Sequence, residues 1–170
     1  MQIETPAREY HPELISRRGE MTAWLLGIIA LAAWIFLLVG DYPVFFGLPV
    51  VAVVLLLAAF SISLGNWMDR QSVIRITSDR ILFRNGVRHT ELEWDQVEQV
   101  KRYKHRWGDK VHVIGEQSHF SFRTFGEVKV GGEVKGRMGF KDGDEILGIL
   151  LESAELREIE HDEGYSYYAR

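Results

Sequence analysis

Cysteine is absent from the 170 residues of this chain. That absence excludes disulfides, thiolate nucleophiles and zinc sites built on cysteine, and it is consistent with a domain that faces the cytosol. Catalytic motifs are missing as well, since the sequence has no glycine-rich phosphate loop, no G-x-S-x-G segment and no H-E-x-x-H helix. We therefore expect no enzymatic activity, no cofactor and no small-molecule substrate.

Charge is missing from two long apolar runs, residues 21–40 and 44–65, which only residues 41–43 separate. At about 1.5 Å per residue, each run is long enough to cross a hydrocarbon layer about 30 Å thick. The lack of ionisable side chains within the runs argues against a transporter or a pump. Residues 1–20 are too acidic for a signal peptide. The sequence therefore predicts a transmembrane hairpin over residues 21–65.

Arginines flank this hairpin at its two outer ends only. Three precede the first run, none lies in the turn, and four follow the second run: Arg8, Arg17, Arg18, then Arg70, Arg75, Arg80 and Arg84. The positive-inside rule predicts that both termini are cytoplasmic in an inner or plasma membrane. Trp24 and Trp67 lie near the predicted inner boundary and Tyr42 at the outer one, as expected for interfacial aromatic residues.

Small residues and prolines predict details of the hairpin. Each run has one small-xxx-small pair near its inner end, Ala23 with Gly27 and Ala59 with Ser63. Such pairs allow close helix contact, either within the hairpin or as a seam between copies of the chain. Pro43 suits the first turn of the second helix, whereas Pro49 is expected to kink it slightly.

The remaining residues divide by charge and by period. Residues 66–141 carry 15 Lys or Arg against 10 Asp or Glu, while residues 142–163 carry one Arg against nine acids. From residue 71 the apolar residues alternate, with turn residues between segments, which predicts short antiparallel strands. The expected strands are 73–77, 80–85, 87–93, 99–106, 110–114 and 119–123, with a helical turn at 94–97, a hairpin or mobile loop over 126–136, and a last short strand ending near Phe140.

A helical pattern follows the last strand. Asp142 and Glu145 have the spacing of a capping box. An apolar stripe follows (Ile146, Leu147, Ile149, Leu150, Leu151 and Ala154). Strands followed by one amphipathic helix predict an α+β arrangement, in which the helix closes one end of a small β-barrel or sandwich. Residues 158–170 are then expected to form an acidic, tyrosine-rich tail.

Two segments, VIRITSDRILFRNGVRHTELEWDQVEQVKR and GRMGFKDGDEILGILLESAEL, resemble bacterial pleckstrin-homology-like (PH-like) domains, which often follow one or two membrane helices. The resemblance covers residues 71–157 and depends on Thr77, Arg80, Gly86, the spacing of Leu92, Val97 and Val100, and the strand Met138–Phe140. It implies a fold more than a function. Eukaryotic PH domains grip phosphoinositides with a basic first loop, but here that loop is Ser78-Asp79, so this ligand is not expected.

Residues 101–107 form the densest basic segment. On a continuous strand, Arg102, Lys104 and Arg106 share one face, where they could contact anionic headgroups, pair with a partner or the acidic helix, or remain solvated. With Trp107 and Trp67, these three residues are the candidate lipid- or partner-binding residues.

Three histidines recur every seven residues in the same region. Tight turns would align His105, His112 and His119 across neighbouring strands, which makes them a weak candidate metal site. Ordinary sheet histidines are the simpler interpretation, so we expect no metal.

The leading functional hypothesis is a membrane-anchored PH-like module that binds protein, as a scaffold, assembly factor or accessory subunit of a membrane complex. The alternatives are a sensor of anionic lipid surfaces and an oligomeric membrane assembly. Nucleic acid is not an expected partner, because the basic excess is modest and the domain is tethered to a membrane.

Overall fold

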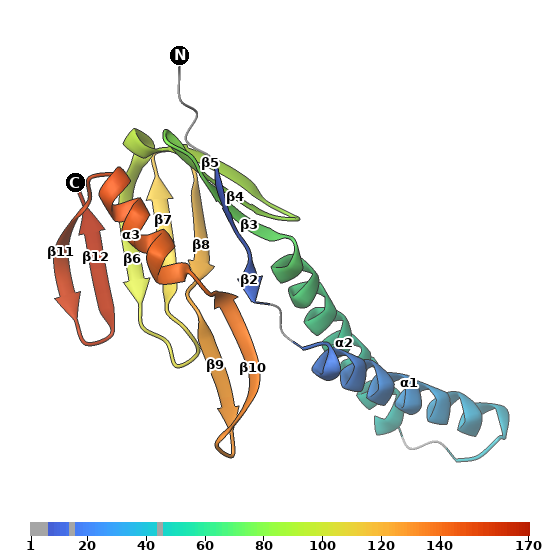
Figure 1. Cartoon of the computed structure of the whole chain (residues 1–170). Coiled ribbons are helices and arrows are strands. Elements are labelled where there is room, and N and C mark those ends of the chain that lie inside the picture. Colours follow the sequence, from blue (N-terminus) through green and yellow to red (C-terminus); the bar gives the residue numbers. More distant parts are fainter. Residues whose placement is uncertain (1–6, 14–15, 44–45) are drawn as a thin grey trace. The chain divides into compact units, whose positions relative to one another are not determined.

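The structure is a computed structural model that describes residues 7–13, 16–43 and 46–170. The chain forms two compact units (Figure 1). One unit is a helical hairpin, Ser16–Trp67, and the other is rich in β-strands and combines the N-terminal residues with Met68–Arg170.

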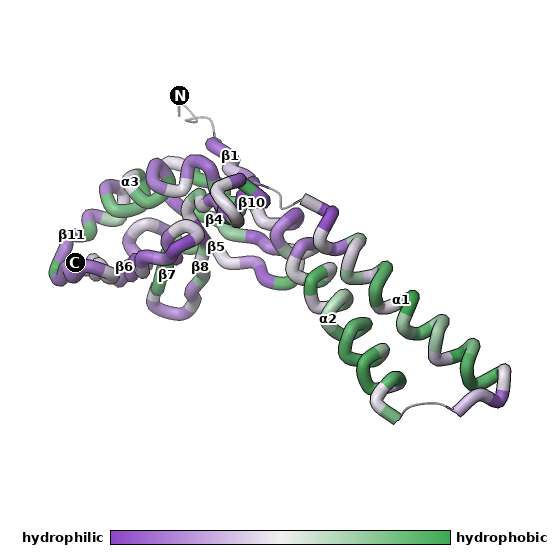
Figure 2. Tube along the Cα trace, turned by 90° about the horizontal axis from the view of Figure 1, so that it is seen from below, coloured by the Kyte–Doolittle hydropathy of each residue, from purple (hydrophilic) through white to green (hydrophobic). Residues whose placement is uncertain are grey.

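The helical hairpin consists of α1 (Arg18–Val39) and α2 (Gly47–Arg70). Both helices are long and apolar enough to cross a membrane (Figure 2). Residues 44–45 lie outside the described residues, and Pro43 precedes the described helix, so its expected place in the first turn is not observed. Pro49 occupies that first turn instead, where a missing N–H breaks no helical hydrogen bond. The lost helical hydrogen bond that would cause the expected kink at Pro49 is therefore absent.

Small residues allow the two helices to approach closely. Gly27, Ala52 and Ala59 are buried. A Cβ atom added at Gly27 would lie 2.9 Å from Cδ2 of Leu56, which is too close for a real contact. Gly27 and Ala59 thus pack within the hairpin, as the first of the two sequence interpretations predicts.

A polar network joins the two helices near the start of α1 and the end of α2. The Trp24 indole N–H donates a hydrogen bond to the Ser63 hydroxyl over 2.7 Å. That hydroxyl donates to one carboxylate oxygen of Glu20 over 3.0 Å, and the amide of Asn66 donates to the other over 3.0 Å. The predicted small residue Ser63 therefore contributes a hydrogen bond as well as a close approach.

Twelve strands are described in the β-rich unit, arranged in three open sheets. The first sheet has the order β1-β3-β4-β5, with β1 (Arg8–Tyr10), β3 (Ser72–Ile76), β4 (Arg80–Asn85) and β5 (His89–Glu93). The second has the order β2-β10-β9, with β2 (Pro12–Glu13), β10 (Glu133–Phe140) and β9 (Gly126–Val130). The third has the order β11-β12-β6-β7-β8, with β11 (Arg157–Asp162), β12 (Tyr165–Ala169), β6 (Val97–Tyr103), β7 (Lys110–Gly115) and β8 (His119–Arg123).

The predicted strands from residue 73 to residue 123 correspond to β3 to β8, and the helical turn is the 3₁₀ helix η1 (Trp94–Gln96). For residues 126–136 the sequence allowed either a hairpin or a loop. In the structure these residues form a hairpin. It turns at Gly131 and Gly132, whose φ angles of 62° and 86° favour glycine.

Residues that precede the membrane helices belong to the β-rich unit. β1 pairs antiparallel with β3, so that Tyr10 lies opposite Ile74, and β2 pairs with β10. Tyr10 is buried, and its hydroxyl donates a hydrogen bond to Glu145 over 3.0 Å. The expected capping box does not form, since Asp142 makes no side-chain cap hydrogen bond. Glu145 instead accepts the hydrogen bond from Tyr10.

The core lies between the first and third sheets and is covered by α3 (Gly143–Ser153). Ile146, Leu147 and Leu150 of the predicted stripe are buried, and α3 lies across one face of the third sheet (Figure 1). The ring of Phe83 stacks on that of Phe120 at 5.1 Å between centroids. The sheets are open in the described residues, so the expected closed barrel is not seen, and α3 covers a sheet face instead of a barrel end.

The C-terminal residues do not form the expected tail. β11 and β12 form an antiparallel hairpin, and β12 pairs with β6, which widens the third sheet. All six residues of β11 are exposed, so this strand has no alternating apolar pattern by which the sequence could reveal it.

Candidate functional site

The predicted basic strand is interrupted in the structure. β6 ends at Tyr103, and Lys104 and Arg106 lie in the exposed loop before β7, so they do not share a strand face with Arg102. Arg102 is partly buried on the side of α3, where its guanidinium pairs with Asp109 at 2.7 Å and with Asp144 at 3.0 Å. Pairing with the acidic helix was one of the alternatives considered from the sequence. These ion pairs make Arg102 less available to anionic lipid headgroups.

The remaining predicted binding residues are dispersed. Trp107 lies in the same loop and is exposed, and Trp67 is exposed on α2. Trp107 belongs to the β-rich unit and Trp67 to the helical hairpin, and each is described within its own unit.

The three histidines are not aligned. His112 lies opposite Lys101 on β6 and Ser121 on β8, whereas His119 lies opposite Ile114 and His105 lies in the loop. The six-residue loop between β6 and β7 replaces the tight turn that the alignment required. Among the described residues, no cluster of three or more His, Asp or Glu side chains could hold a metal ion.

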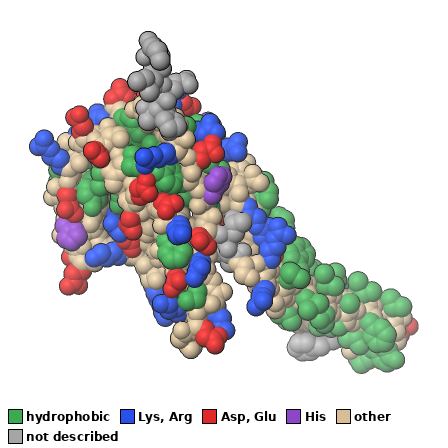
Figure 3. All heavy atoms as spheres, viewed as in Figure 1, with side chains coloured by type: hydrophobic (Ala, Val, Ile, Leu, Met, Phe, Trp, Pro, Cys, Tyr) green, Lys and Arg blue, Asp and Glu red, His purple; other side chains and the backbone are tan. Residues whose placement is uncertain are grey.

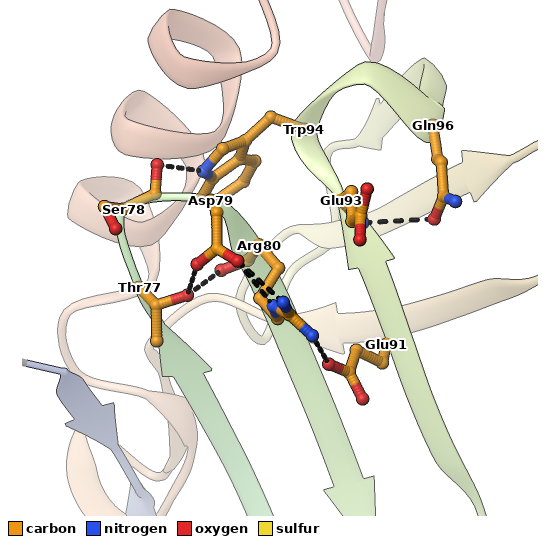
Figure 4. Close-up of polar contacts among 8 residues, drawn as sticks. All are labelled: Thr77, Ser78, Asp79, Arg80, Glu91, Glu93, Trp94 and Gln96. Atoms are coloured by element: carbon orange, nitrogen blue, oxygen red, sulfur yellow. Dashed lines mark hydrogen bonds and ion pairs between the residues drawn. The ribbon is translucent and has the colours of Figure 1, made fainter.

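The turn between β3 and β4 is closed by its own side chains (Figure 4). The Asp79 carboxylate accepts hydrogen bonds from Arg80 and Thr77, each over 2.8 Å, and these bonds lower the pKa of Asp79. The Arg80 guanidinium also pairs with Glu91 on β5. The turn therefore has an acid at its tip, as its sequence predicts, and the neighbouring cation Arg80 is already paired.

One face of the third sheet carries a cluster that the sequence did not predict, here called the tyrosine face. It comprises side chains of β12, β6 and β7 that point away from α3: Tyr165, Tyr167, Tyr103, Lys101 and His112. The register places Tyr165 opposite Tyr103, and Tyr167 opposite Lys101, which in turn lies opposite His112. Arg102, between them in sequence, points to the other side, toward Asp144.

The rings of the tyrosine face contact one another yet remain accessible. Tyr103 and Tyr165 lie 5.1 Å apart, and Tyr103 meets the His112 ring edge to face at 5.6 Å. The Lys101 ammonium lies 5.6 Å from the centre of the Tyr167 ring, within cation–π range. Tyr103 is 40% exposed. Tyrosine side chains are enriched at protein interfaces and among the residues that dominate binding there.

The sequence contained one signal for this face that was not used. Tyr165, Ser166 and Tyr167 alternate, and in the structure Ser166 is buried while the two tyrosines lie on the outer side. A period of two among aromatic residues is typical of a strand. The acidic residues that precede Tyr165 favoured the interpretation of residues 158–170 as a tail.

Burial and neighbouring cations lower the pKa of His112. Partial burial is the largest cause, followed by the charges of Lys110, His119 and Lys101. Its imidazole is therefore neutral over a wider pH range than a free histidine, and the positive charge of the tyrosine face comes from lysine.

Comparison of the chain with protein families, curated proteins and solved structures finds no match.

Proposed function

We propose that this chain is a membrane-anchored interaction module of PH-like type, which binds a protein partner through the tyrosine face as a scaffold or accessory subunit of a membrane complex. The observation that carries the proposal is the cluster of tyrosine, lysine and histidine side chains on one sheet face, in a chain that also contains two helices able to span a membrane. The small two-layer β domain covered by one amphipathic helix is compatible with a PH-like fold.

Strand pairing supports a hairpin topology for the two helices. β1 precedes α1 and β3 follows α2, yet the two strands pair along Arg8–Ile76 to Tyr10–Ile74. Paired strands must lie on one side of a membrane, so helices that cross it must do so an even number of times. The arginine distribution makes that side the cytoplasm.

The tyrosine face favours a protein partner over a lipid surface reached through residues 102–106. Arg102 is paired with two acids, and only Lys104 and Arg106 of the predicted cationic triad remain in the loop. Tyrosine and cationic side chains together suit a partner surface that presents carboxylates and an apolar patch.

Site-specific photocrosslinking in intact membranes tests this function. A photoreactive phenylalanine analogue at Tyr167 should give one discrete protein crosslink, and the Tyr103→Ala change should reduce its yield at least fivefold. The same analogue at Ile159, which is exposed on β11, is the matched control and should give none. Crosslinks at Tyr167 to a second copy would instead indicate an oligomeric assembly, and crosslinks to lipid alone would contradict a protein partner.

A topology reporter tests the membrane orientation separately. Reporters fused before Met1 and after Arg170 should both be found in the cytoplasm. A reporter at either end that is active outside the cell would contradict the proposed hairpin.

A further inference from the structure

A cavity of about 380 Å³ opens in the β-rich unit between β2, β3, β8 and β10. Its lining combines four charged side chains, Glu13, Asp69, Lys110 and Arg123, with buried phenylalanine rings. The volume lies within the range of small-ligand sites in proteins. Lys110 also borders the tyrosine face, because it lies opposite Tyr103, but the other three charges are not part of that face.

The two cations of the cavity are direct cross-strand neighbours. Lys110 on β7 lies opposite Arg123 on β8. Like charges in this position destabilise a sheet, whereas elsewhere Arg75 pairs with the acid opposite it, Glu9. In the described part of the chain neither Lys110 nor Arg123 has an acidic partner within 4.0 Å, and Arg123 contacts only the weak acceptor Sδ of Met138, at 3.3 Å. An anion between the two cations would relieve their repulsion.

The two acids of the cavity form no ion pair, although Asp69 interacts electrostatically with Arg123. Glu13 on β2 and Asp69 near the end of α2 have no ion-pair partner within 4.0 Å among the described residues. Two cations and two acids give the lining no net charge. A ligand with both signs of charge is more complementary to such a lining than a simple anion, because it offers a partner to the cations and to the carboxylates.

Both chain connections to the apolar helices border this cavity. Glu13 is five residues before the start of α1, a reach of about 18 Å at most, and Asp69 belongs to the last turn of α2. A cavity so placed along the chain is within covalent reach of a bilayer surface, where phospholipid headgroups are present at high local concentration.

We propose that this cavity binds the phosphoethanolamine headgroup of a membrane phospholipid. The phosphate lies between Lys110 and Arg123. The primary ammonium group points to Glu13 and Asp69, whose carboxylates accept hydrogen bonds from its N–H groups. A choline headgroup has no N–H to donate, and a glycerol headgroup has no cation. Phosphatidylethanolamine therefore binds more tightly than either. The inference rests on the proposed membrane location and does not depend on the protein partner.

Native mass spectrometry of the full-length protein tests the site. The protein is released from nanodiscs that contain equal amounts of phosphatidylethanolamine, phosphatidylcholine and phosphatidylglycerol, and the retained lipid is identified. We expect phosphatidylethanolamine to be enriched at least fivefold over the others. The variant K110Q/R123Q should lose at least tenfold of this adduct, whereas R123K, which keeps the charge, should stay within threefold.

Matched variants make the result decisive. K104Q/R106Q removes two exposed cations outside the cavity and should retain the lipid, whereas E13Q/D69N should shift the preference from phosphatidylethanolamine to phosphatidylglycerol. Equal retention of all three lipids, or an equal loss in K104Q/R106Q, would overturn the proposal. Displacement of the retained lipid by millimolar soluble phosphoethanolamine supports headgroup recognition, and binding of that compound without lipid retention would overturn the lipid source. Release of the protein from membranes by alkaline carbonate would instead refute the membrane location itself.

Discussion

The helical hairpin and the β-rich unit bury opposite kinds of side chain. Inside the hairpin lie Gly27, Ala52 and Ala59, while large apolar residues such as Phe36 face outward. Inside the β-rich unit lie large residues such as Phe120, while charges of both signs cover its surface (Figure 3). In water, burial of large apolar groups drives folding, but in lipid that drive is absent and close packing with hydrogen bonds takes its place. The comparison predicts that different kinds of mutation lower the stability of the two units.

Loss of a large side chain should harm the β-rich unit most. Leu150 on α3 is fully buried, so Leu150→Ala should lower the free energy of unfolding by about 2–5 kcal/mol. Chemical denaturation of the full-length protein in detergent, followed by near-ultraviolet circular dichroism, measures the change. Leu151→Ala, at a partly buried neighbour, is the control and should cost less. A loss below about 0.5 kcal/mol for Leu150→Ala would mean that this face is not part of the core.

Gain of a large side chain should harm the hairpin. Gly27→Leu inserts atoms where even a Cβ meets Leu56 at 2.9 Å, so we expect a loss of about 1–3 kcal/mol. Gly65→Leu is the matched control, because a Cβ there has nothing within 4 Å. Thermal unfolding in detergent, followed by tryptophan fluorescence, compares the two variants. Equal stability of both would show that the helices do not pack through Gly27.

A hydrogen bond between helices should matter more than one within a helix. Ser63→Ala leaves the Trp24 N–H without its acceptor and should cost about 1 kcal/mol. Ser61→Ala removes only a bond to the carbonyl of Leu57 in the same helix and should cost less. The same fluorescence assay applies. A larger loss in Ser61→Ala than in Ser63→Ala would contradict the network.

The smallest effect concerns pH. Because the pKa of His112 is lowered in the folded protein, the unfolded chain takes up the proton first as pH falls below the ordinary value of 6.5. His112 therefore makes stability decline slightly as the pH falls below about 6.5. His112→Gln should flatten the dependence of the melting temperature on pH in this acidic range. An unchanged slope in His112→Gln would contradict the burial of the imidazole.

Local periodicity was sufficient to predict the two apolar helices and the strands β3 to β8. It failed for β1, whose partner β3 is more than 60 residues away, and for β11, where every side chain is exposed. Neither strand has an apolar face of its own. β1 is held by backbone pairing with a strand that is distant in sequence, and β11 by pairing with the adjacent β12, so propensity alone could not reveal either strand.

The candidate sites depended on register, which the sequence left undetermined. The histidine alignment assumed a two-residue turn at Gly108-Asp109, but the loop spans residues 104–109 and shifts His105 out of the sheet. The tyrosine face requires β12 beside β6, a pairing between residues about 60 positions apart. Residue types can therefore be read from the sequence, whereas their spatial neighbours depend on strand pairings that local patterns do not reveal.

The pairing of β1 with β3 has a consequence for how the protein is made. The first sheet is assembled from segments that flank both apolar helices, so under the proposed topology it stays incomplete until the second helix has inserted. A chain in which only one helix crosses the bilayer would leave these strands in separate compartments, with an unpaired edge on each side. Such edges invite aggregation and recognition by quality-control factors. Correct insertion of the hairpin and completion of the soluble fold thus become a single checkpoint during biogenesis.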